Sequence, residues 1–158
     1  LIKTIAVYDT PFWRHQGLNG QANSDQGPVK VTLDVSPQSG APGVIAGFID
    51  GDDARALSDL PARARARLAL TSYVRYFGPQ AARPRRYFDQ VWDHEAYTGG
   101  CPVGVMPPGV MTEYGPALRA RVGHIHWAGT ETATRWNGYM DGAVRSGERA
   151  AAEVLAEL

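Results

Sequence analysis

The chain has 158 residues, with 16 basic and 16 acidic side chains and therefore no formal net charge at pH 7. This balance gives no electrostatic reason to expect a nucleic-acid partner or an anionic membrane surface. The apolar fraction of 44% is enough for a hydrophobic core and excludes a disordered chain. No stretch approaches the roughly 20 apolar residues that cross a bilayer.

Cys101 is the single cysteine, which excludes an internal disulfide framework. A lone thiol is compatible with a reducing compartment, so we expect a soluble, cytoplasmic protein. The chain opens with LIKTIAVY, already in the pattern of a strand, without an initiator Met or a signal peptide. This opening predicts the C-terminal portion of a larger protein.

The first half of the chain predicts three strands and a helix. IKTIAVY (2–8) is strand-like, and GVIAGFI (43–49) is a continuous apolar run typical of a more buried strand. Between them, apolar residues alternate and predict one half-buried face. They are Val29, Val31, Leu33 and Val35.

The helix is predicted to begin near Ser58, with Pro61 in its first turn, and to end at Gly78. Its inner side is expected to comprise Leu60, Ala64, Leu68, Thr71, Val74 and Phe77. The arginines at 63, 65 and 67 are expected to face solvent.

In the second half, PRRYFDQVWD (84–93) predicts a strand, and residues 96–116 form a loop rich in Gly and Pro. HIHWAG (124–129) predicts a short strand. A final helix follows, capped by Asn137, with helical spacing of the apolar residues at 140, 143, 144, 147, 151, 154, 155 and 158.

The connection before the final helix, GTETATRWNG (129–138), is longer and more mixed in character than an ordinary turn. If Asn137 caps the helix, the first-turn amides from Gly138 to Asp141 lack partners and favour an electron-rich ligand atom. Gly129 and Gly138 would let the backbone approach a ligand closely. The alternative is a capped helix that packs on a sheet and binds nothing.

AGTETATRWNGYMDGAVRSGERAA (128–151) closely resembles the C-terminal signature of the flavin-dependent monoamine oxidases. The resemblance extends to VWDHEAYTGGCPVGVMPPGVMTEYG (91–115), IKTIAVYDTPFW (2–13) and VIAGFI (44–49). It implies an α/β fold, namely the C-terminal part of a two-domain FAD-dependent amine oxidase. The N-terminal dinucleotide-binding unit is absent from this chain, because no G-x-G-x-x-G occurs.

By this resemblance, residues 1–93 are part of the substrate-binding domain, with a mixed sheet. Residues 94–158 are the C-terminal FAD-binding segment, with the last strand and helix of the FAD domain. The implied function is FAD-dependent oxidative deamination of a small-molecule amine by O2, yielding aldehyde, ammonia and hydrogen peroxide. The missing unit would come from the N-terminal portion of the same protein or from a partner chain. The isolated fragment is expected to be inactive, and a homodimer is left open.

The resemblance assigns eight residues to FAD binding: Trp92, Tyr97, Cys101, Gly129, Thr130, Glu131, Gly138 and Met140. Cys101 matches the cysteine that bonds to the flavin 8α-methyl carbon in the animal enzymes. Its alternatives are a small buried residue and non-covalently held FAD. The backbone of Met140 would meet the flavin pyrimidine edge.

Lys3 and Tyr139 are the catalytic candidates, and Leu18 and Phe48 match cavity-lining positions for substrate. The lysine that matches Lys3 holds a water near flavin N5, and burial would favour its neutral amine. The alternative for Lys3 is an exposed residue at a frayed terminus. Tyr139 matches one wall of an aromatic cage, which would also bind substrate. The other wall, directly after the cysteine, is here Pro102.

Other functions remain open at this point. A polyamine oxidase or an L-amino-acid oxidase would use the same cofactor, although no arginine is an obvious partner for a substrate carboxylate. A non-catalytic truncated fragment, or a subunit completed by a separate nucleotide-binding chain, belongs to another class. His124 and His126 share a face of one predicted strand, but without a third ligand at suitable spacing no metal site is predicted.

Overall fold

The structure is a computed structural model that describes all 158 residues, and it divides into two units, residues 1–99 and residues 100–158. The sequence placed the boundary between residues 93 and 94. The assignment of the two parts to a substrate domain and an FAD segment stays a prediction. No helix has both the length and the apolar character that a membrane crossing requires.

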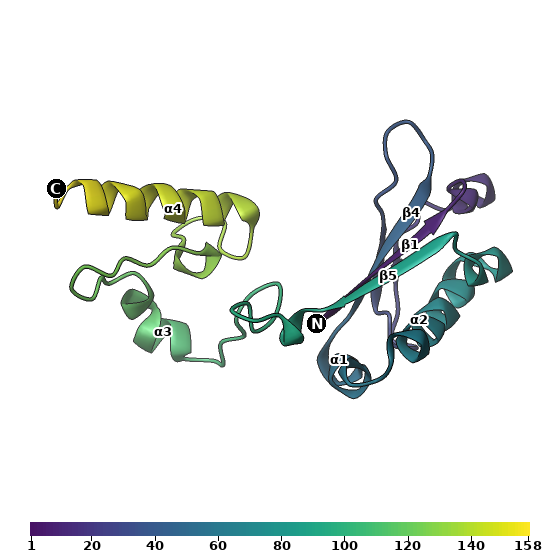
Figure 1. The fold of residues 1–158 in the computed structure, drawn as a ribbon, viewed down its shortest axis with the longest axis horizontal. Coiled ribbons are helices and arrows are strands. Elements are labelled where there is room, and N and C mark those ends of the chain that lie inside the picture. Colours follow the sequence, from purple (N-terminus) through teal and green to yellow (C-terminus); the bar gives the residue numbers. More distant parts are fainter. The chain divides into compact units, whose positions relative to one another are not determined.

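Residues 1–99 contain a five-stranded sheet in the order β2-β3-β4-β1-β5 (Figure 1). The strands are β1 Ile2–Tyr8, β2 Ala22–Asn23, β3 Val31–Asp34, β4 Gly43–Ile49 and β5 Arg86–Val91. The predicted strands 2–8 and 43–49 are confirmed, and 84–93 is confirmed in its central part. Every neighbouring pair is antiparallel, so the expected mixed sheet is wrong for these residues. β1 lies between β4 and β5, and both run opposite to it.

The helix expected from near Ser58 to Gly78 is confirmed as α2 Ala62–Phe77, although it begins later than predicted. A separate helix that was not predicted, α1 Gly51–Ser58, precedes it. Pro61 occupies the N-cap position of α2. Proline has no N–H to donate and a fixed φ, so it suits the start of a helix and interrupts a continuous one. Short 3-10 turns complete the unit: η1 Phe12–Gln16, η2 Pro79–Ala82 and η3 Trp92–His94.

The core of this unit lies between the sheet and α2, which runs along one face of the sheet (Figure 1). Tyr73 of α2 is fully buried, and its hydroxyl bonds the Thr4 hydroxyl of β1 at 2.7 Å. Burial raises the pKa of Tyr73 far above its ordinary value of 10.0. A Cβ at Gly47 would lie 2.4 Å from the Tyr73 hydroxyl oxygen, so glycine permits this close approach.

The sheet-facing side of α2 differs from the predicted one. Its buried residues are Ala69, Ser72, Tyr73 and Phe77, of which the sequence predicted only Phe77. Leu68 is 36% exposed. Arg65, expected in solvent, is mostly buried and pairs with Asp89 at 2.7 Å. The buried residues define the side of α2 that faces the sheet, and Leu68 lies on another side of the helix.

The face predicted for β3 is also reversed. Thr32 is buried and donates to Gly20 O at 3.1 Å, whereas Leu33 and Val35 are exposed and Val31 is half-buried. Val29 is buried, but it precedes the strand. Alternation indicates which residues share a face, and it does not say which face the rest of this chain covers.

Residues 100–158 contain α3 Val110–Tyr114 and α4 Met140–Leu155, with 3-10 turns η4 Gly115–Leu118 and η5 Thr130–Thr132 (Figure 1). The strand predicted at 124–129 is wrong. The structure has an isolated bridge between Val122 and Ile125 instead. A strand needs a neighbouring backbone to pair with, and this unit contains no other strand that could supply one.

The final helix exists, but its cap and buried side differ from the prediction. Tyr139 is the N-cap residue of α4, without a side-chain cap, and Asn137 donates to Glu131 O at 3.0 Å instead. The buried residues of α4 are Gly142 and Ser146. The predicted apolar stripe is exposed, as Met140, Val144 and Leu155 illustrate.

Candidate functional site

The turn that begins at Gly129 has a backbone that requires glycine. Gly129 has φ 138°, in the left-handed region that other residues rarely adopt. Its carbonyl accepts hydrogen bonds from the Thr132 amide and the Thr132 hydroxyl, both at 2.9 Å. A Cβ at Gly129 would meet only the Glu131 carboxylate, at 3.5 Å. The turn is therefore closed by its own hydrogen bonds and open to approach at Gly129.

The segment after Cys101 lies against this turn. The Gly104 amide donates to a carboxylate oxygen of Glu131 at 3.4 Å. Val103 Cγ1 lies 3.5 Å from the position that a Cβ would take at Gly138. The structure thus brings together two stretches that the sequence assigned separately to the cofactor, residues 101–104 and residues 129–140. Cys101 itself is half-buried.

An exposed aromatic pair stands between the turn and α4. The rings of Trp136 and Tyr139 meet edge to face, with centroids 5.9 Å apart, and Tyr139 is 66% exposed. Trp136 has φ 57°, which is uncommon for a residue other than glycine. Sequence reasoning did not single out Trp136, although its place between the turn and Tyr139 was the available signal.

The start of α4 opens onto the same surface. The Ala143 amide is the first intrahelical donor and bonds to Tyr139 O at 3.2 Å, so the amides of Met140, Asp141 and Gly142 before it have no intrahelical acceptor. The Tyr139 amide, expected to be free, donates to Trp136 O at 3.0 Å. Met140 is 88% exposed. The helix end therefore presents free donors and partial positive charge beside exposed Met140.

In residues 1–99, Lys3 and Phe48 lie on the sheet face opposite α2. They are cross-strand partners of β1 and β4, and Lys3 Nζ lies 5.8 Å from the centroid of the Phe48 ring. This is a cation–π distance. Lys3 also lines a cavity of about 250 Å³ with Ile5, Phe88, Asp89 and Gln90. Lys3 is exposed, so the burial expected for it is not found within this chain.

Three further predicted residues lie in the same unit. Trp92 is half-buried, and its Nε1 is buried without a hydrogen-bond partner. Tyr97 is fully exposed with φ 67°, and Leu18 is 41% exposed after η1. Buried donors are nearly always paired in native proteins, so Trp92 has the strongest physical sign of a missing partner. The roles of all three stay predictions.

The two histidines contact carboxylates of α4. His126 is almost buried, and its Nδ1 lies 3.0 Å from Glu153 Oε2. His124 is exposed, with Nδ1 at 3.6 Å from Glu157 Oε2. His126 and Arg149 both hold the pKa of Glu153 below its ordinary value through hydrogen bonds. These contacts connect the segment around His124 and His126 to the end of α4.

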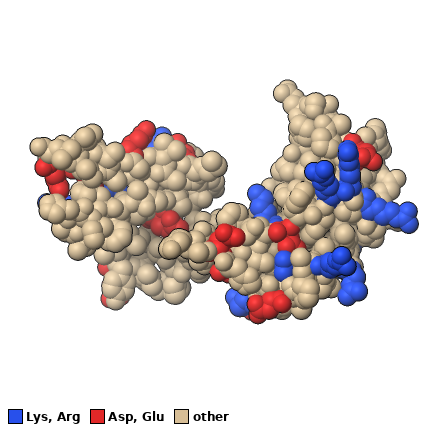
Figure 2. All heavy atoms as spheres, viewed as in Figure 1, with Lys and Arg blue, Asp and Glu red and all other residues tan.

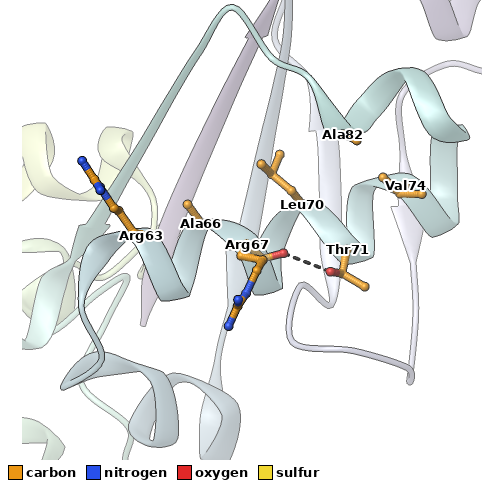
Figure 3. A pocket seen from close by; sticks show the side chains of 7 residues that line it. All are labelled: Arg63, Ala66, Arg67, Leu70, Thr71, Val74 and Ala82. Atoms are coloured by element: carbon orange, nitrogen blue, oxygen red, sulfur yellow. Dashed lines mark hydrogen bonds between the residues drawn. The ribbon is translucent and has the colours of Figure 1, made fainter.

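A groove of about 500 Å³ lies on the outer side of α2 (Figure 3). Ala66, Leu70, Val74 and Ala82 supply its apolar lining, with Arg63, Arg67 and Thr71. Residues 60–88 hold seven arginines and no acidic residue, and Figure 2 shows basic side chains gathered over this unit. The groove contains none of the predicted site residues, so it is not part of the candidate site.

The residues around Gly129 fit one part of a flavin site. Gly129 and Gly138 both have left-handed φ angles, and neither carries a side chain that would stand between the backbone and a planar ring. The amides at the start of α4 suit the electron-rich edge of such a ring. Tyr139 and Met140 are exposed, so side chains of this unit do not fill the surface.

Comparison with known proteins identifies relatives of the whole chain. The sequence profile of a family described as flavin containing amine oxidoreductase matches residues 1–155. AofH of Mycobacterium tuberculosis, named as a flavin-containing monoamine oxidase, is 51% identical over all of this chain. Amine oxidase B of Sus scrofa, also named as flavin-containing, is 43% identical over 98% of the chain. The chain spans 34% and 30% of these two proteins.

Solved structures agree in fold. A putrescine oxidase bound to putrescine superposes with a TM-score of 0.89 at 35% identity, over 98% of this chain and 34% of its own. Cyclohexylamine oxidase from Brevibacterium oxydans superposes with a TM-score of 0.89 at 37% identity, over 99% of this chain and 35% of its own. The profile match, the sequence identities and the superpositions lead to one assignment. The chain belongs to the flavin-containing amine oxidase family.

Proposed function

We propose that the full-length protein oxidises an amine with bound FAD and O2 and releases an aldehyde, ammonia and hydrogen peroxide. The family is FAD-dependent, and its members act on amines. The observation that carries the proposal is the contact between residues 101–104 and residues 129–140. These stretches lie far apart in sequence and meet around open glycines and free helix amides.

A bound FAD would supply the two-electron oxidation of the amine, with O2 as the final electron acceptor. The residues of this chain hold and orient the reactants. The backbone at Gly129 and Gly138 permits close contact with the ring, and the Met140 amide is a donor for its polar edge. Thr130 and Glu131 line the same turn. The exposed ring of Tyr139 orients the amine, and Lys3 supports the step with oxygen.

We propose that Cys101 attaches FAD covalently. Cys101 would hold the flavin through a thioether to its 8α carbon, with loss of the thiol proton and of one hydrogen from that carbon, and O2 would accept the two electrons released. Acid precipitation of the full-length protein tests this step, because covalent flavin stays with the protein pellet. If all flavin is released, the attachment is excluded and the oxidase proposal survives.

The amine class is the finer part of the proposal. Pro102 stands where the resemblance expects an aromatic wall, so Tyr139 would form half of the cage. We therefore expect looser selection among amines than in a cage with two aromatic walls. A diamine substrate is a second candidate, because a similar structure is that of a putrescine oxidase with bound putrescine. An L-amino acid is a weaker third, because the sequence offers no arginine as an obvious partner for a carboxylate.

An anaerobic screen of the full-length protein tests the function directly. Benzylamine, putrescine, cyclohexylamine and L-leucine are added in turn while the flavin absorbance is recorded. We expect bleaching with at least one of the first three and recovery of the colour when O2 is admitted. A protein that holds flavin but is bleached by none of a broad amine set would contradict the oxidase proposal.

Purification of the 158-residue polypeptide separates the remaining alternatives for it. If the 158 residues act with a separate nucleotide-binding chain, a second polypeptide copurifies and flavin depends on it. A non-catalytic fragment would hold no flavin under any of these conditions.

A further inference from the structure

The buried side of α4 carries a hydroxyl that bonds directly to the Gly129 turn. Ser146 is 1% exposed. Its Oγ donates to Ala143 O at 2.7 Å and accepts from the Gly129 amide at 2.9 Å. A hydroxyl has one donor and two acceptor lone pairs, so both contacts are satisfied together. Ser146 is not among the residues that the sequence assigned to the site.

One turn further along α4, Arg149 holds the same turn from both ends. Its Nη2 donates to Trp127 O at 2.7 Å and to the Thr132 hydroxyl at 3.2 Å. Its Nη1 donates to Glu153 Oε1 at 2.5 Å, which orients the guanidinium. Trp127 precedes Gly129 and Thr132 follows it. α4 therefore contacts the turn before, at and after Gly129.

These contacts select one backbone conformation of the turn. Glycine can adopt several conformations, so residue 129 does not by itself determine the direction of its amide. In a trans peptide the N–H and C=O groups point in opposite directions. With the Gly129 N–H directed at Ser146, the Ala128 carbonyl is directed away from α4, where it can accept from a ligand.

We infer that Ser146 and Arg149 are positioning residues that preset the Gly129 turn for the cofactor. The inference rests on the proposed function and deepens it. Ser146 directs the peptide group before Gly129, and Arg149 fixes the two ends of the turn. Neither touches the reacting atoms. Their effect reaches the flavin through the backbone of residues 127–132.

The first test uses the full-length protein without added FAD. Hydrogen exchange at the Gly129 amide is measured for the wild type, Ser146→Ala and Ser146→Thr. Losing one hydrogen bond should speed exchange by about tenfold in Ser146→Ala. Ser146→Thr keeps the hydroxyl and should restore the wild-type rate. Equal exchange in all three proteins overturns the role of Ser146.

The second test measures FAD affinity and the flavin absorption spectrum with a matched pair on α4, in a Cys101→Ser background so that flavin binding is reversible. Arg149 and Arg145 both pair with a carboxylate four residues away, but only Arg149 contacts the turn. Arg149→Met should weaken FAD binding by about tenfold and shift the flavin spectrum. Arg145→Met should match the wild type in both. If the two variants behave alike, or if Arg149→Met loses thermal stability with an unchanged spectrum, the positioning role is wrong.

Failure of the proposed function gives a different pattern. A wild-type protein that binds no flavin, or whose flavin no amine bleaches, contradicts the function while the exchange at Gly129 still reports on Ser146. Normal flavin binding and bleaching in both Ser146→Ala and Arg149→Met, with wild-type spectra, leaves the function intact and overturns the inference.

Discussion

In residues 1–99 the buried apolar side chains form one cluster between the sheet and α2, whereas in residues 100–158 Ala133 alone is a buried apolar residue. The second unit is tied instead by side chains that bond to backbone groups, such as Ser146 to Gly129 and Asn137 to Glu131. Its large apolar residues on α4 are exposed.

The first unit is therefore organised around an apolar core, and the second around hydrogen bonds beside exposed apolar side chains. A contiguous exposed apolar stripe on a helix marks a surface that other groups cover. Hydrogen bonds fix the backbone of residues 127–139 without filling the space beside it. We therefore expect substitutions in residues 1–99 to act mainly on stability, and those in residues 100–158 to act mainly on the cofactor.

Arg65→Met should have the largest effect on stability. The Arg65–Asp89 pair is mostly buried, so removing Arg65 leaves a buried charge without its partner. We expect the free energy of unfolding to fall by about 3–5 kcal/mol, measured by urea denaturation. Arg67→Met, on the exposed side of α2, is the matched control and should change little. Equal effects of the two variants would show that the buried pair contributes nothing.

Gly142→Ala should disturb the second unit next most strongly. A Cβ at Gly142 would lie 2.2 Å from Trp136 O, a backbone atom that cannot move aside cheaply. We expect the free energy of unfolding to fall by about 1–3 kcal/mol and FAD binding to weaken. A Cβ at Gly147, on the same helix, would meet nothing within 4 Å. Gly147→Ala should therefore raise the free energy of unfolding by about 0.5–1 kcal/mol, because alanine has the higher helix propensity. Similar behaviour of the two variants would contradict the packing at Trp136.

Acid should weaken the first unit through Asp34. Burial alone would raise the pKa of Asp34, but hydrogen bonds from Ser36, Trp13 and Arg14 outweigh it and lower the pKa from 3.8 to about 2. Because the folded-state pKa is the lower one, the stabilisation is complete above 3.8 and is lost as the pH falls toward 2. Urea denaturation should show Asp34→Asn less stable than the wild type at pH 7, with the difference shrinking toward pH 2. A constant difference at every pH would contradict this.

Lys3→Met should change stability least, by under about 0.5 kcal/mol, because Lys3 is exposed. In stopped flow we expect slower reaction of the reduced flavin with O2 and an unchanged rate of reduction by amine. An unchanged rate with O2 removes Lys3 from the proposed chemistry. A slower reaction with O2 would identify one functional residue in residues 1–99, where we expect other substitutions to act mainly on stability.

Much of the fold could be predicted where the signal is local. The alternation in 2–8, the apolar run 43–49 and the helical spacing after Met140 each correspond to an observed element. The helix α1 was missed because its sequence is short and polar. The strand at 124–129 was wrong because pairing depends on a neighbouring strand that this unit lacks.

The candidate site also has a part that local sequence predicts and a part that depends on tertiary contacts. The string from Gly129 to Met140 identified the turn, and the left-handed φ of Gly129 agrees with the demand for glycine there. Nothing local indicated that Ser146 would bond to the Gly129 amide or that Gly104 would reach Glu131. Such contacts depend on how the chain returns on itself, which a pattern along the sequence does not contain.

The sequence by itself determined the family, the main strands and helices, and the position of the glycine turn, because spacing and identity are local properties of the chain. The tertiary structure alone decided which faces are covered. In the folded chain Ser72 and Tyr73 face the sheet, and Lys3 and Phe48 lie on the opposite, exposed face. The Ser146 hydroxyl accepts a hydrogen bond from the Gly129 amide. Burial and hydrogen bonding depend on the neighbouring element, so only the folded chain settles them.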